Sequence, residues 1–423
     1  MLSKKTSKRF LLTPLSSAIL AAIFMQSAAA YEFDKPIENA FKLGQDDAKY
    51  GQIKLDLNYR FEMSDIANNA KDTGLANTLR LRLGYLTPKF HGLQGFAEFE
   101  GNLGMQKDYF APLASPSFDA RREVIADPQA SELNQLWVSF TGIPDTEIKG
   151  GRQRIKLDDD RFIGNVGWRQ MEQTYDGVIV TNTSVENLTL KAGYIANVQN
   201  IWSQEDAVQL PFLNANYQYK DLVRVTGYGY WFSDYDTGQA GRSTQTYGVA
   251  LNGSPKITQD ITLHYTAEYS YQGDYANNPN SINLSRYNLM GGASFMGVTL
   301  KGAVEELGAN GTQAFQTPFG TNHGFQGWAD MFLVTPKDGV RDINATLGAA
   351  PLGIKMAFVY HNFQSVTNNI DYGNEYDFLI TKKFGKHYQL LAKYAYYDAN
   401  EAHGIATLNK DVNKFWLQAS VSF

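Results

Sequence analysis

The side chains of this 423-residue sequence that are best suited to chemistry are arginines that gather in one stretch. Arg152, Arg154, Arg161 and Arg169 form the densest basic cluster. A guanidinium group presents a planar fork of donors that fits the oxygens of a carboxylate or a phosphate. Two interpretations of the cluster stay open. The arginines contact an anionic solute, or they form ion pairs that fix the neighbouring acidic run at 158–160.

Other polar groups do not form the pattern of a catalytic or metal site. The run at 158–160 lacks the interleaved ligands and the glycine of a calcium loop. His323 and Asp330 could share a proton, but no nucleophile with a supporting base accompanies them. The six histidines show no metal-ligand spacing, and the chain has no cysteine. We therefore predict no catalytic residue, no metal and no cofactor.

The elements that must position these side chains are strands, because apolar and polar residues alternate with a period of two. The alternation is clear at 53–61, 79–85, 261–271 and 354–360. About ten residues suffice for a tilted strand to cross the hydrocarbon layer of a membrane. The 25 tyrosines and 25 phenylalanines often stand at segment ends, where aromatic girdles meet lipid headgroups. The pattern predicts an all-β fold, a transmembrane antiparallel β-barrel.

Both ends of the chain agree with export to a membrane. Residues 1–30 have the basic cluster, apolar run and small-residue cleavage site of a secretory signal peptide. We expect 31–50 to be a periplasmic segment and 51–423 to be the barrel. The last strand alternates from 415 and ends on Phe423, which resembles the terminal signal of Gram-negative outer-membrane barrels. This resemblance implies the barrel-assembly machinery as a partner of the C-terminal strand.

The connections between segments alternate between long and short, as the external loops and periplasmic turns of such barrels do. Long connections are expected near 64–77, 105–131, 156–168, 197–210, 234–244, 273–284, 364–374 and 398–411. Short ones are expected near 87–92, 142–145, 184–187, 220–221, 296–297, 349–352 and 384–388, with a middling one at 252–260. If both termini are periplasmic, the strand count must be even. Eighteen strands result when the apolar segment 328–335 lies inside a loop spanning roughly 305–340.

This long loop is expected to fold into the lumen and narrow it. Residues 328–333 are mostly apolar, and such a patch is rarely left in water. Packing the patch against the inner wall would place Phe319, His323, Trp328 and Asp330 at a constriction. The alternative is that the loop caps one rim of the barrel outside the conduction path.

The inner wall is expected to carry the charged side chains, because an Arg or Lys at the lipid midplane costs about 2–4 kcal/mol. Ten inward bases are Lys54, Arg60, Arg80, Arg82, Lys191, Arg224, Arg286, Lys301, Lys355 and Lys393. Six inward acids are Asp56, Glu62, Glu98, Glu100, Glu268 and Asp377. The whole chain carries a net charge of −5, so the excess acid falls in loops and turns. The basic excess on the wall favours weak anion selectivity, unless the charges merely pair across strands.

From these faces and the arginine cluster we predict a set of residues that line the pore or contact the solute. They are Arg80, Arg82, Arg152, Arg154, Arg161, Arg169, Lys191, Arg224, Arg286 and Lys355.

Two stretches resemble one known family. The first comprises Gly151-Arg152-Gln153-Arg154-Ile155, Asp160-Arg161-Phe162-Ile163-Gly164, Trp168-Arg169-Gln170 and Gln173-Thr174-Tyr175-Asp176-Gly177. The second runs from Thr317-Pro318-Phe319-Gly320 through Thr321-Asn322-His323-Gly324-Phe325 to Gln326-Gly327-Trp328-Ala329-Asp330. Both are similar to motifs of the alginate-export family of outer-membrane porins. The resemblance implies a monomeric 18-stranded barrel in the outer membrane of a Gram-negative bacterium.

The leading functional hypothesis is a channel for passive diffusion of small or oligomeric anionic solutes. An adhesin or receptor acting through its external loops and a dedicated polysaccharide exporter are the alternatives, whereas the missing catalytic pairing disfavours an outer-membrane enzyme. The expected partners are outer-membrane lipid, lipopolysaccharide, and anionic small molecules or oligosaccharides. Nothing in the sequence indicates a nucleic-acid partner.

Overall fold

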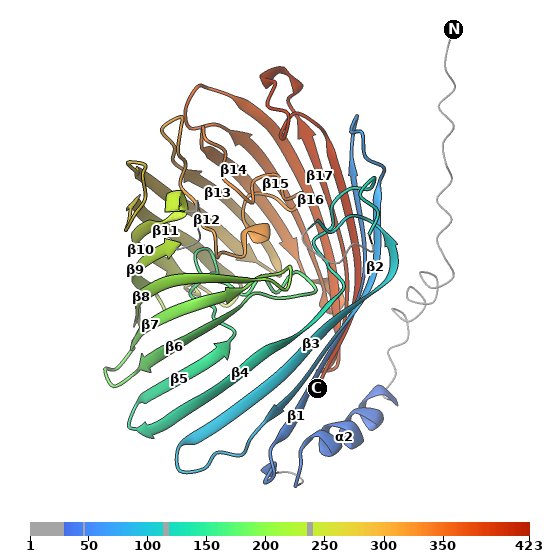
Figure 1. Cartoon of the computed structure of the whole chain (residues 1–423), viewed down its shortest axis with the longest axis vertical. Coiled ribbons are helices and arrows are strands. Elements are labelled where there is room, and N and C mark those ends of the chain that lie inside the picture. The colour runs from blue at the N-terminus through green and yellow to red at the C-terminus, as the bar shows by residue number, and fades with distance from the viewer. Residues whose placement is uncertain (1–28, 45–46, 113–117, 235–239) are drawn as a thin grey trace.

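A closed sheet of eighteen antiparallel strands forms the wall of the molecule in a computed structural model that describes residues 29–44, 47–112, 118–234 and 240–423 (Figure 1). Each strand pairs with its neighbours in sequence, and β18 returns to pair with β1. The predicted barrel and strand count are confirmed. Residues 1–28, which hold nearly all of the predicted signal peptide, lie outside the described residues.

The strands have the following bounds. They are β1 (Gln52–Ile66), β2 (Gly74–Leu86), β3 (Leu93–Asp108), β4 (Ala130–Ile143), β5 (Thr146–Gln153), β6 (Thr174–Asn182), β7 (Leu188–Gln199), β8 (Glu205–Tyr219), β9 (Val223–Asp234), β10 (Thr244–Gly253), β11 (Ile261–Asp274), β12 (Asn283–Phe295), β13 (Val298–Leu307), β14 (Val340–Ala349), β15 (Ile354–Gln364), β16 (Asp371–Phe384), β17 (Tyr388–Ala399) and β18 (Val412–Ser422).

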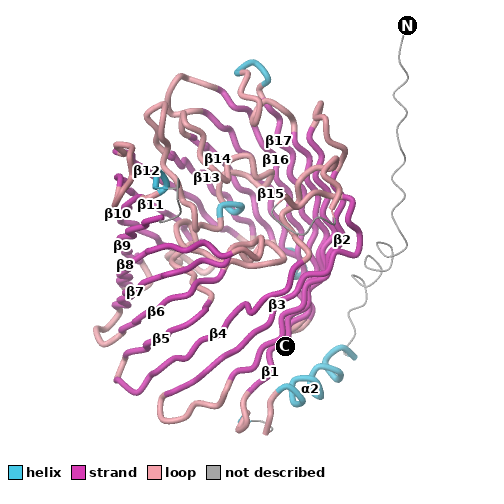
Figure 2. Tube along the Cα trace, in the orientation of Figure 1, coloured by secondary structure: helices cyan, strands magenta, loops and turns pink. Residues whose placement is uncertain are grey.

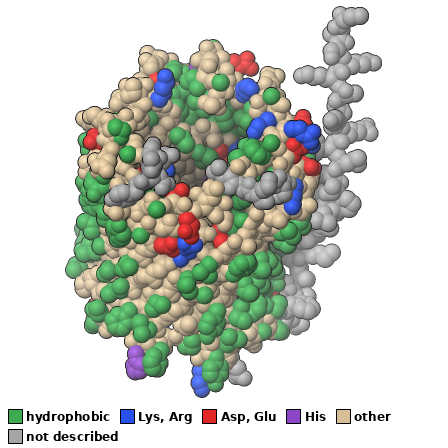
Figure 3. Space-filling view, viewed as in Figure 1, with side chains coloured by type: hydrophobic (Ala, Val, Ile, Leu, Met, Phe, Trp, Pro, Cys, Tyr) green, Lys and Arg blue, Asp and Glu red, His purple; other side chains and the backbone are tan. Residues whose placement is uncertain are grey.

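The two faces of each strand differ as the alternation of the sequence predicts. In β2, Thr78, Arg80 and Arg82 are buried on the lumen side, whereas Leu79 and Leu83 are exposed on the outside. Successive side chains of a strand point to opposite faces, so one register turns every second side chain, the polar one, towards the lumen. Hydrophobic side chains cover much of the outer wall that faces the viewer in Figure 3. This apolar surface is suited to contact with lipid.

The connections form two classes that lie at opposite rims, here named the loop end and the turn end. The C-terminus lies at the turn end, near the short connections (Figure 1). Segment 328–335 lies within the connection 308–339 between β13 and β14, at the position that the even strand count requires. The predicted long connection at 197–210 is in fact only 200–204. The strands continue further there because Gln199 pairs with Glu205 and the backbone ladder extends to the end of β7.

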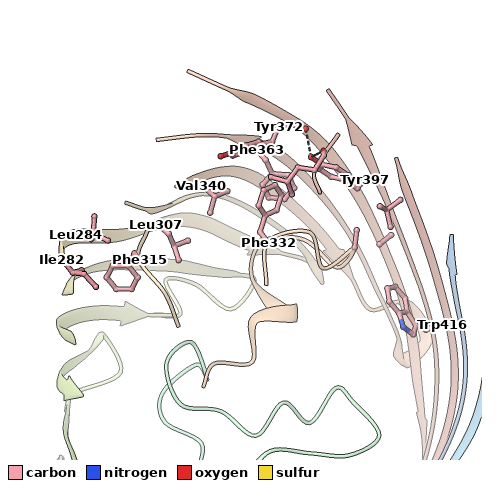
Figure 4. Close-up of a cluster of buried hydrophobic side chains, with 14 residues drawn as sticks. Ile282, Leu284, Leu307, Phe315, Phe332, Val340, Phe363, Tyr372, Tyr397 and Trp416 are labelled. Atoms are coloured by element: carbon pink, nitrogen blue, oxygen red, sulfur yellow. Dashed lines mark hydrogen bonds between the residues drawn. The ribbon is translucent and has the colours of Figure 1, made fainter. Parts of the chain in front are cut away.

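Two connections run into the barrel instead of standing above it (Figure 2). Here they are called loop A, residues 154–173 between β5 and β6, and loop B, residues 308–339 between β13 and β14. Phe332 of loop B packs on Phe363, Tyr372 and Tyr397 of the wall (Figure 4). A barrel of this size would otherwise enclose a wide aqueous passage. The two loops therefore provide a core inside the lumen.

One helix, α2 (Ala29–Phe41), lies beside the turn end near the C-terminus (Figure 1). Among the described residues, no helix has both the length and the apolar character that crossing a membrane requires.

The lipid-facing wall gives the first prediction. Leu289, in the middle of β12, is 49% exposed on the outside, and its neighbour Met290 lies on the lumen side opposite Thr266. Leu289→Arg should destabilise the inserted barrel by about 2–4 kcal/mol, because its charge would face hydrocarbon. Met290→Arg adds the same charge one residue away and serves as the control. The yield of heat-modifiable barrel in membrane fractions distinguishes them, and equal yields would contradict the assigned faces.

Candidate functional site

Loops A and B meet inside the barrel and form one unit. Ile163 of loop A pairs with Phe319 of loop B, and the backbone nitrogen of Gly164 donates to the carbonyl of Phe319 at 2.9 Å. The nitrogen of Thr321 donates back to the carbonyl of Asp160 at 2.8 Å. A Cβ atom on Gly320 would collide with the carbonyl oxygen of Arg161, so this close approach requires glycine. The two family-like motifs of the sequence thus lie against each other.

A buried ion-pair cluster joins these loops to the wall on one side of the lumen. The Nε atom of Arg161 in loop A lies 3.2 Å from Glu305 of β13, and its Nη2 donates to Gln326 of loop B at 2.8 Å. Arg286 of β12 lies 2.7 Å from Glu305 and 3.0 Å from Glu268. Arg161 and Arg286 are 2% and 0% exposed. Because a buried charge needs compensation, each of these arginines serves to hold the loops in place.

A second buried cluster fixes the loops to another part of the wall, at β1 and β18. Arg169 of loop A lies 3.0 Å from Glu62 of β1 and 3.2 Å from Asp330 of loop B. Lys414 of β18 donates to Asp330 at 2.8 Å. Arg60 of β1 lies 3.1 Å from Asp127. These carboxylates come from β1, from loop B and from the connection between β3 and β4, so the cluster ties both loops to the wall and to that connection.

Four more of the predicted arginines, all but Arg224, are also ion-paired. The Nε atom of Arg154 donates to Glu172 at 2.7 Å, and Arg82 pairs with Glu100 and lies 3.7 Å from Glu172. Arg152 makes two hydrogen bonds to Asp176, at 2.8 and 2.7 Å, and also contacts Glu205 and Gln199. Arg80 pairs with Asp56. Seven of the ten residues predicted to line the pore therefore hold ion pairs. In the described part of the chain, the other three, Lys191, Arg224 and Lys355, have no ion pair.

Lys393 of β17 sits in a cage of aromatic rings where loops A and B reach the wall. Its Nζ lies 3.8 Å from the ring centre of Trp328 in loop B and 4.2 Å from that of Trp168 in loop A. Trp416 of β18 completes the cage at 5.5 Å. Such cation–π contacts are strongest when the cation is desolvated, and Lys393 is only 6% exposed.

His323 of loop B connects Lys393 to Asp330, which belongs to the second buried ion-pair cluster. Its Nδ1 lies 2.6 Å from Asp330, and its Nε2 lies 2.7 Å from the Nζ of Lys393. An ammonium group can only donate, so Nε2 must accept and Nδ1–H must donate to Asp330. The ring is therefore neutral. Burial lowers the pKa of His323 to about 3, and this outweighs the opposing effect of Asp330.

The backbone of loop B is held by carboxylates of the wall. The nitrogen of Ala329 donates to Glu375 at 2.7 Å, and that of Trp328 donates to Asp377 at 3.2 Å. Gly327 has a φ of +76°, and a Cβ atom there would collide with the Glu375 carboxylate. Trp328 and His323 thus contact the wall directly, and Phe319 packs edge-on against Phe232. These placements give the four residues predicted for the constriction a defined position in the lumen.

Sequence reasoning missed several acids that complete these clusters, chiefly Glu172, Glu305, Asp127 and Glu375. Glu305 follows Lys301 by four residues in the same strand, so the alternation that assigned Lys301 inward would also have assigned Glu305 inward. Glu172 lies within the first family-like stretch but outside any alternating segment. Within the described ranges, no group of three or more His, Asp or Glu residues could hold a metal ion.

One region of open space lies between the loops and the β1–β5 wall. One cavity of about 560 Å³ is lined by residues that include Asp56, Glu98, Arg154 and Trp168. A second of about 380 Å³ shares the first three of these residues and reaches Phe423 at the turn end. The two cavities are therefore adjacent along one wall. They give a route from the turn end to the loops that is lined by both charged and apolar side chains, and the arrangement is suited to solute passage.

Solved structures of other bacterial proteins share this fold. Acinetobacter baumannii OccAB3 matches with a TM-score of 0.70 at 11% identity, covering 88% of this chain and 99% of that one. Pseudomonas aeruginosa OpdK, determined with vanillate, matches at 0.64 and 13%, covering 88% and 98%. A BenF-like porin from Pseudomonas fluorescens Pf-5 matches at 0.67 and 13%, covering 88% and 99%. No curated protein sequence matches this chain.

The closed barrel, its apolar outer wall and its polar lumen define the class of protein: this is an outer-membrane porin of the Gram-negative type. More particularly, the chain belongs to the alginate export family, whose model matches residues 50–302. The first family-like stretch lies inside this range, and the second, in loop B, lies beyond it. The predicted family and location are confirmed.

The neutral state of His323 predicts that acid weakens the docking of loop B. An undocked His323 would take up a proton below about pH 6.5, whereas the docked ring resists protonation down to about pH 3. Docking is therefore complete above pH 6.5 and weakens as the pH falls from there, because burial disfavours an imidazolium at this position by more than Asp330 favours it. Single-channel recordings should show more frequent fluctuations between conductance levels at pH 4.5 than at pH 7.5.

The matched variant is His323→Gln, whose amide can both donate and accept a hydrogen bond but cannot be protonated. Its recordings should change little between the two pH values. An equal response to acid in both proteins would show that another group carries the effect.

Proposed function

We propose that this porin allows passive diffusion of small or oligomeric anionic solutes. The observation that carries the proposal is a set of inward bases without ion pairs among the described residues, concentrated towards the turn end of the lumen. They are Lys54, Lys191, Arg224, Lys301, Lys355 and Lys383. In the clusters that hold the loops, by contrast, bases and acids offset each other.

Acids do little to offset these bases. Asp56 pairs with Arg80, and Glu98 accepts hydrogen bonds from Asn134 and Gln135. A surplus of basic side chains lowers the electrostatic barrier to anions, and the low-dielectric wall focuses the field. Exposed charges are screened over about 8 Å at physiological ionic strength, so the preference should be modest.

The wider arrangement supports a passive channel over the alternatives. Buried ion pairs hold loops A and B to two parts of the inner wall, at β13 and at β1 and β18, so a polymer of the width of a polysaccharide would have to displace the loops. A dedicated exporter is therefore a poorer fit than a channel for small solutes. The vanillate in the OpdK structure is a carboxylate, which agrees with anionic solutes for a barrel of this fold. No observation favours an adhesin or receptor.

The proposal includes the placement of the molecule. We infer that the turn end, with α2 and the C-terminus, faces the periplasm, and that loops at the other rim face outward. The barrel acts as a monomer whose outer wall contacts lipid and lipopolysaccharide, after the assembly machinery has engaged its C-terminal strand. It acts without enzymatic activity, cofactor or nucleic-acid partner.

The inward Lys and Arg side chains without ion pairs predict that the pore is weakly selective for anions and that these charges on the wall cause the selectivity. The reversal potential under a KCl gradient should indicate a preference for chloride. The triple variant Arg224→Gln, Lys301→Gln and Lys355→Gln should lower the chloride-to-potassium permeability ratio by about twofold, because it removes three inward charges.

The control for this variant is Lys89→Gln, Lys220→Gln and Lys256→Gln, which removes three charges from the connections at the same rim but none from the wall. Clear cation selectivity of the parent protein, or equal shifts in both triple variants, would refute the proposal.

The position of loop B predicts that it limits conductance. Deleting residues 317–333 should enlarge the single-channel conductance several-fold, because the deletion removes Phe319, His323, Trp328 and Asp330 from the lumen together. Deleting 276–280, in the connection between β11 and β12, is the control for loop shortening. Unchanged conductance in a correctly inserted barrel would place loop B outside the conduction path.

A further inference from the structure

The closure of the barrel depends on a single strand pair that the chain does not connect. Every other neighbouring pair of strands is consecutive in sequence, so a turn or loop holds the two strands together. The pair β1–β18 brings together residues from the two ends of the chain, from Asp56 opposite Ser422 to Ile66 opposite Val412. No covalent connection limits the entropy that this pair loses on closing. The β1–β18 pair is here called the seam.

The helix α2 is attached to the β1 side of this seam. Lys42, directly after the helix, forms a bridge with Gln52 of β1. The nitrogen of Leu43 donates to the carbonyl of Gly51 at 3.0 Å, and the nitrogen of Tyr50 donates to the carbonyl of Leu43 at 2.8 Å. These bonds hold the end of α2 against the start of β1.

From there α2 reaches past the end of β18 to the β16–β17 turn. Glu38 lies 2.6 Å from the Nε2 atom of His387, which is in that turn. The hydroxyl of Tyr388 donates to Asp34 at 2.9 Å. The ring of Phe41 contacts Phe423, the last residue of the chain, edge-on at 5.8 Å. The helix is thus attached to β1 and also contacts the start of β17 and the residue that follows β18.

His387 is the centre of this contact surface. Its Nδ1 lies 2.6 Å from the carbonyl oxygen of Ser422, its Nε2 meets Glu38, and its ring stacks on Phe423 at 4.2 Å. Both ring nitrogens face acceptors, so both donate when the ring is an imidazolium. A hydrogen bond from a cation to a carboxylate is among the stronger ones available to side chains.

We propose that α2 is a clasp that closes the seam of the barrel by docking on the surface formed by His387, Tyr388 and Phe423. It substitutes for the missing connection between β18 and β1. The occupant of this surface is the N-terminal segment of the same chain. The role is independent of which solute crosses the channel.

The clasp should respond to pH through the pair His387 and Glu38. Burial alone would lower the pKa of His387, but the hydrogen bonds to Glu38 and to the Ser422 carbonyl raise it above its ordinary value. The hydrogen bond from His387 also lowers the pKa of Glu38. The other charged groups that face the pair are Asp34, Lys42 and Lys386. The clasp is therefore firm at mildly acidic pH and loosens as the pH rises through the raised pKa of His387.

The test is hydrogen–deuterium exchange of the whole protein in lipid nanodiscs, with Glu38→Ala against Asn39→Ala. Asn39 is exposed on the same helix. At pH 6, Glu38→Ala should raise the exchange rate of β1 and β18 amides near the turn end roughly threefold relative to β8 and β9. Asn39→Ala should leave that ratio unchanged. The ratio in the parent protein should also rise between pH 6 and pH 9, and that of Glu38→Ala should not.

A second measurement reports docking directly. The chain has no cysteine, so Glu38→Cys with His387→Cys creates a unique pair for a short thiol crosslinker. Crosslinked protein should keep slow seam exchange at pH 9. Equal seam exchange in Glu38→Ala and Asn39→Ala, or a rise that extends equally to β8 and β9, would overturn the proposal.

Discussion

The structure depends on the requirement that every backbone hydrogen bond be made within the protein when a sheet crosses a membrane. Lipid offers no partner for an unpaired N–H or C=O group, so the sheet must close on itself. Closure at eighteen strands fixes one face of each strand towards lipid and the other towards the lumen. It also leaves more space inside than wall side chains can fill. Loops A and B occupy part of that space, and their position decides what passes.

Filling the lumen buries charges, and this determines how the loops are held. Arg161, Arg169 and Arg286 are almost fully buried, and an isolated charge in such a place would be strongly unfavourable. Each therefore lies against carboxylates that come from a different part of the chain. Removing one partner would leave the other charge buried and uncompensated, so the loops are held in one arrangement. The inward bases that have no ion pair among the described residues lie towards the turn end of the lumen, away from these clusters.

The sequence was sufficient to predict the strands and their count, because a period of two and alternating connection lengths are local patterns. It also placed Lys393 and Arg286 on the inner face. It did not predict that Arg161 meets Glu305 or that Arg169 meets Glu62, because these contacts join residues more than a hundred positions apart. The sequence of loop A does not alternate between apolar and polar residues, so it does not indicate which of its side chains face the lumen. The contact of Glu38 with His387 spans almost the whole chain and had no signal in the sequence.

The basic residues of the lumen thus form two populations that obey different physics. Buried pairs such as Arg161 with Glu305 exclude water and ions, so added salt screens them weakly. Exposed bases such as Lys355 and Lys383 act through solution, where their field extends only about a Debye length. The width of the passage therefore follows from interactions that persist at high ionic strength. Its selectivity for anions follows from interactions that weaken at high ionic strength. The same passage can therefore stay narrow while it loses its selectivity.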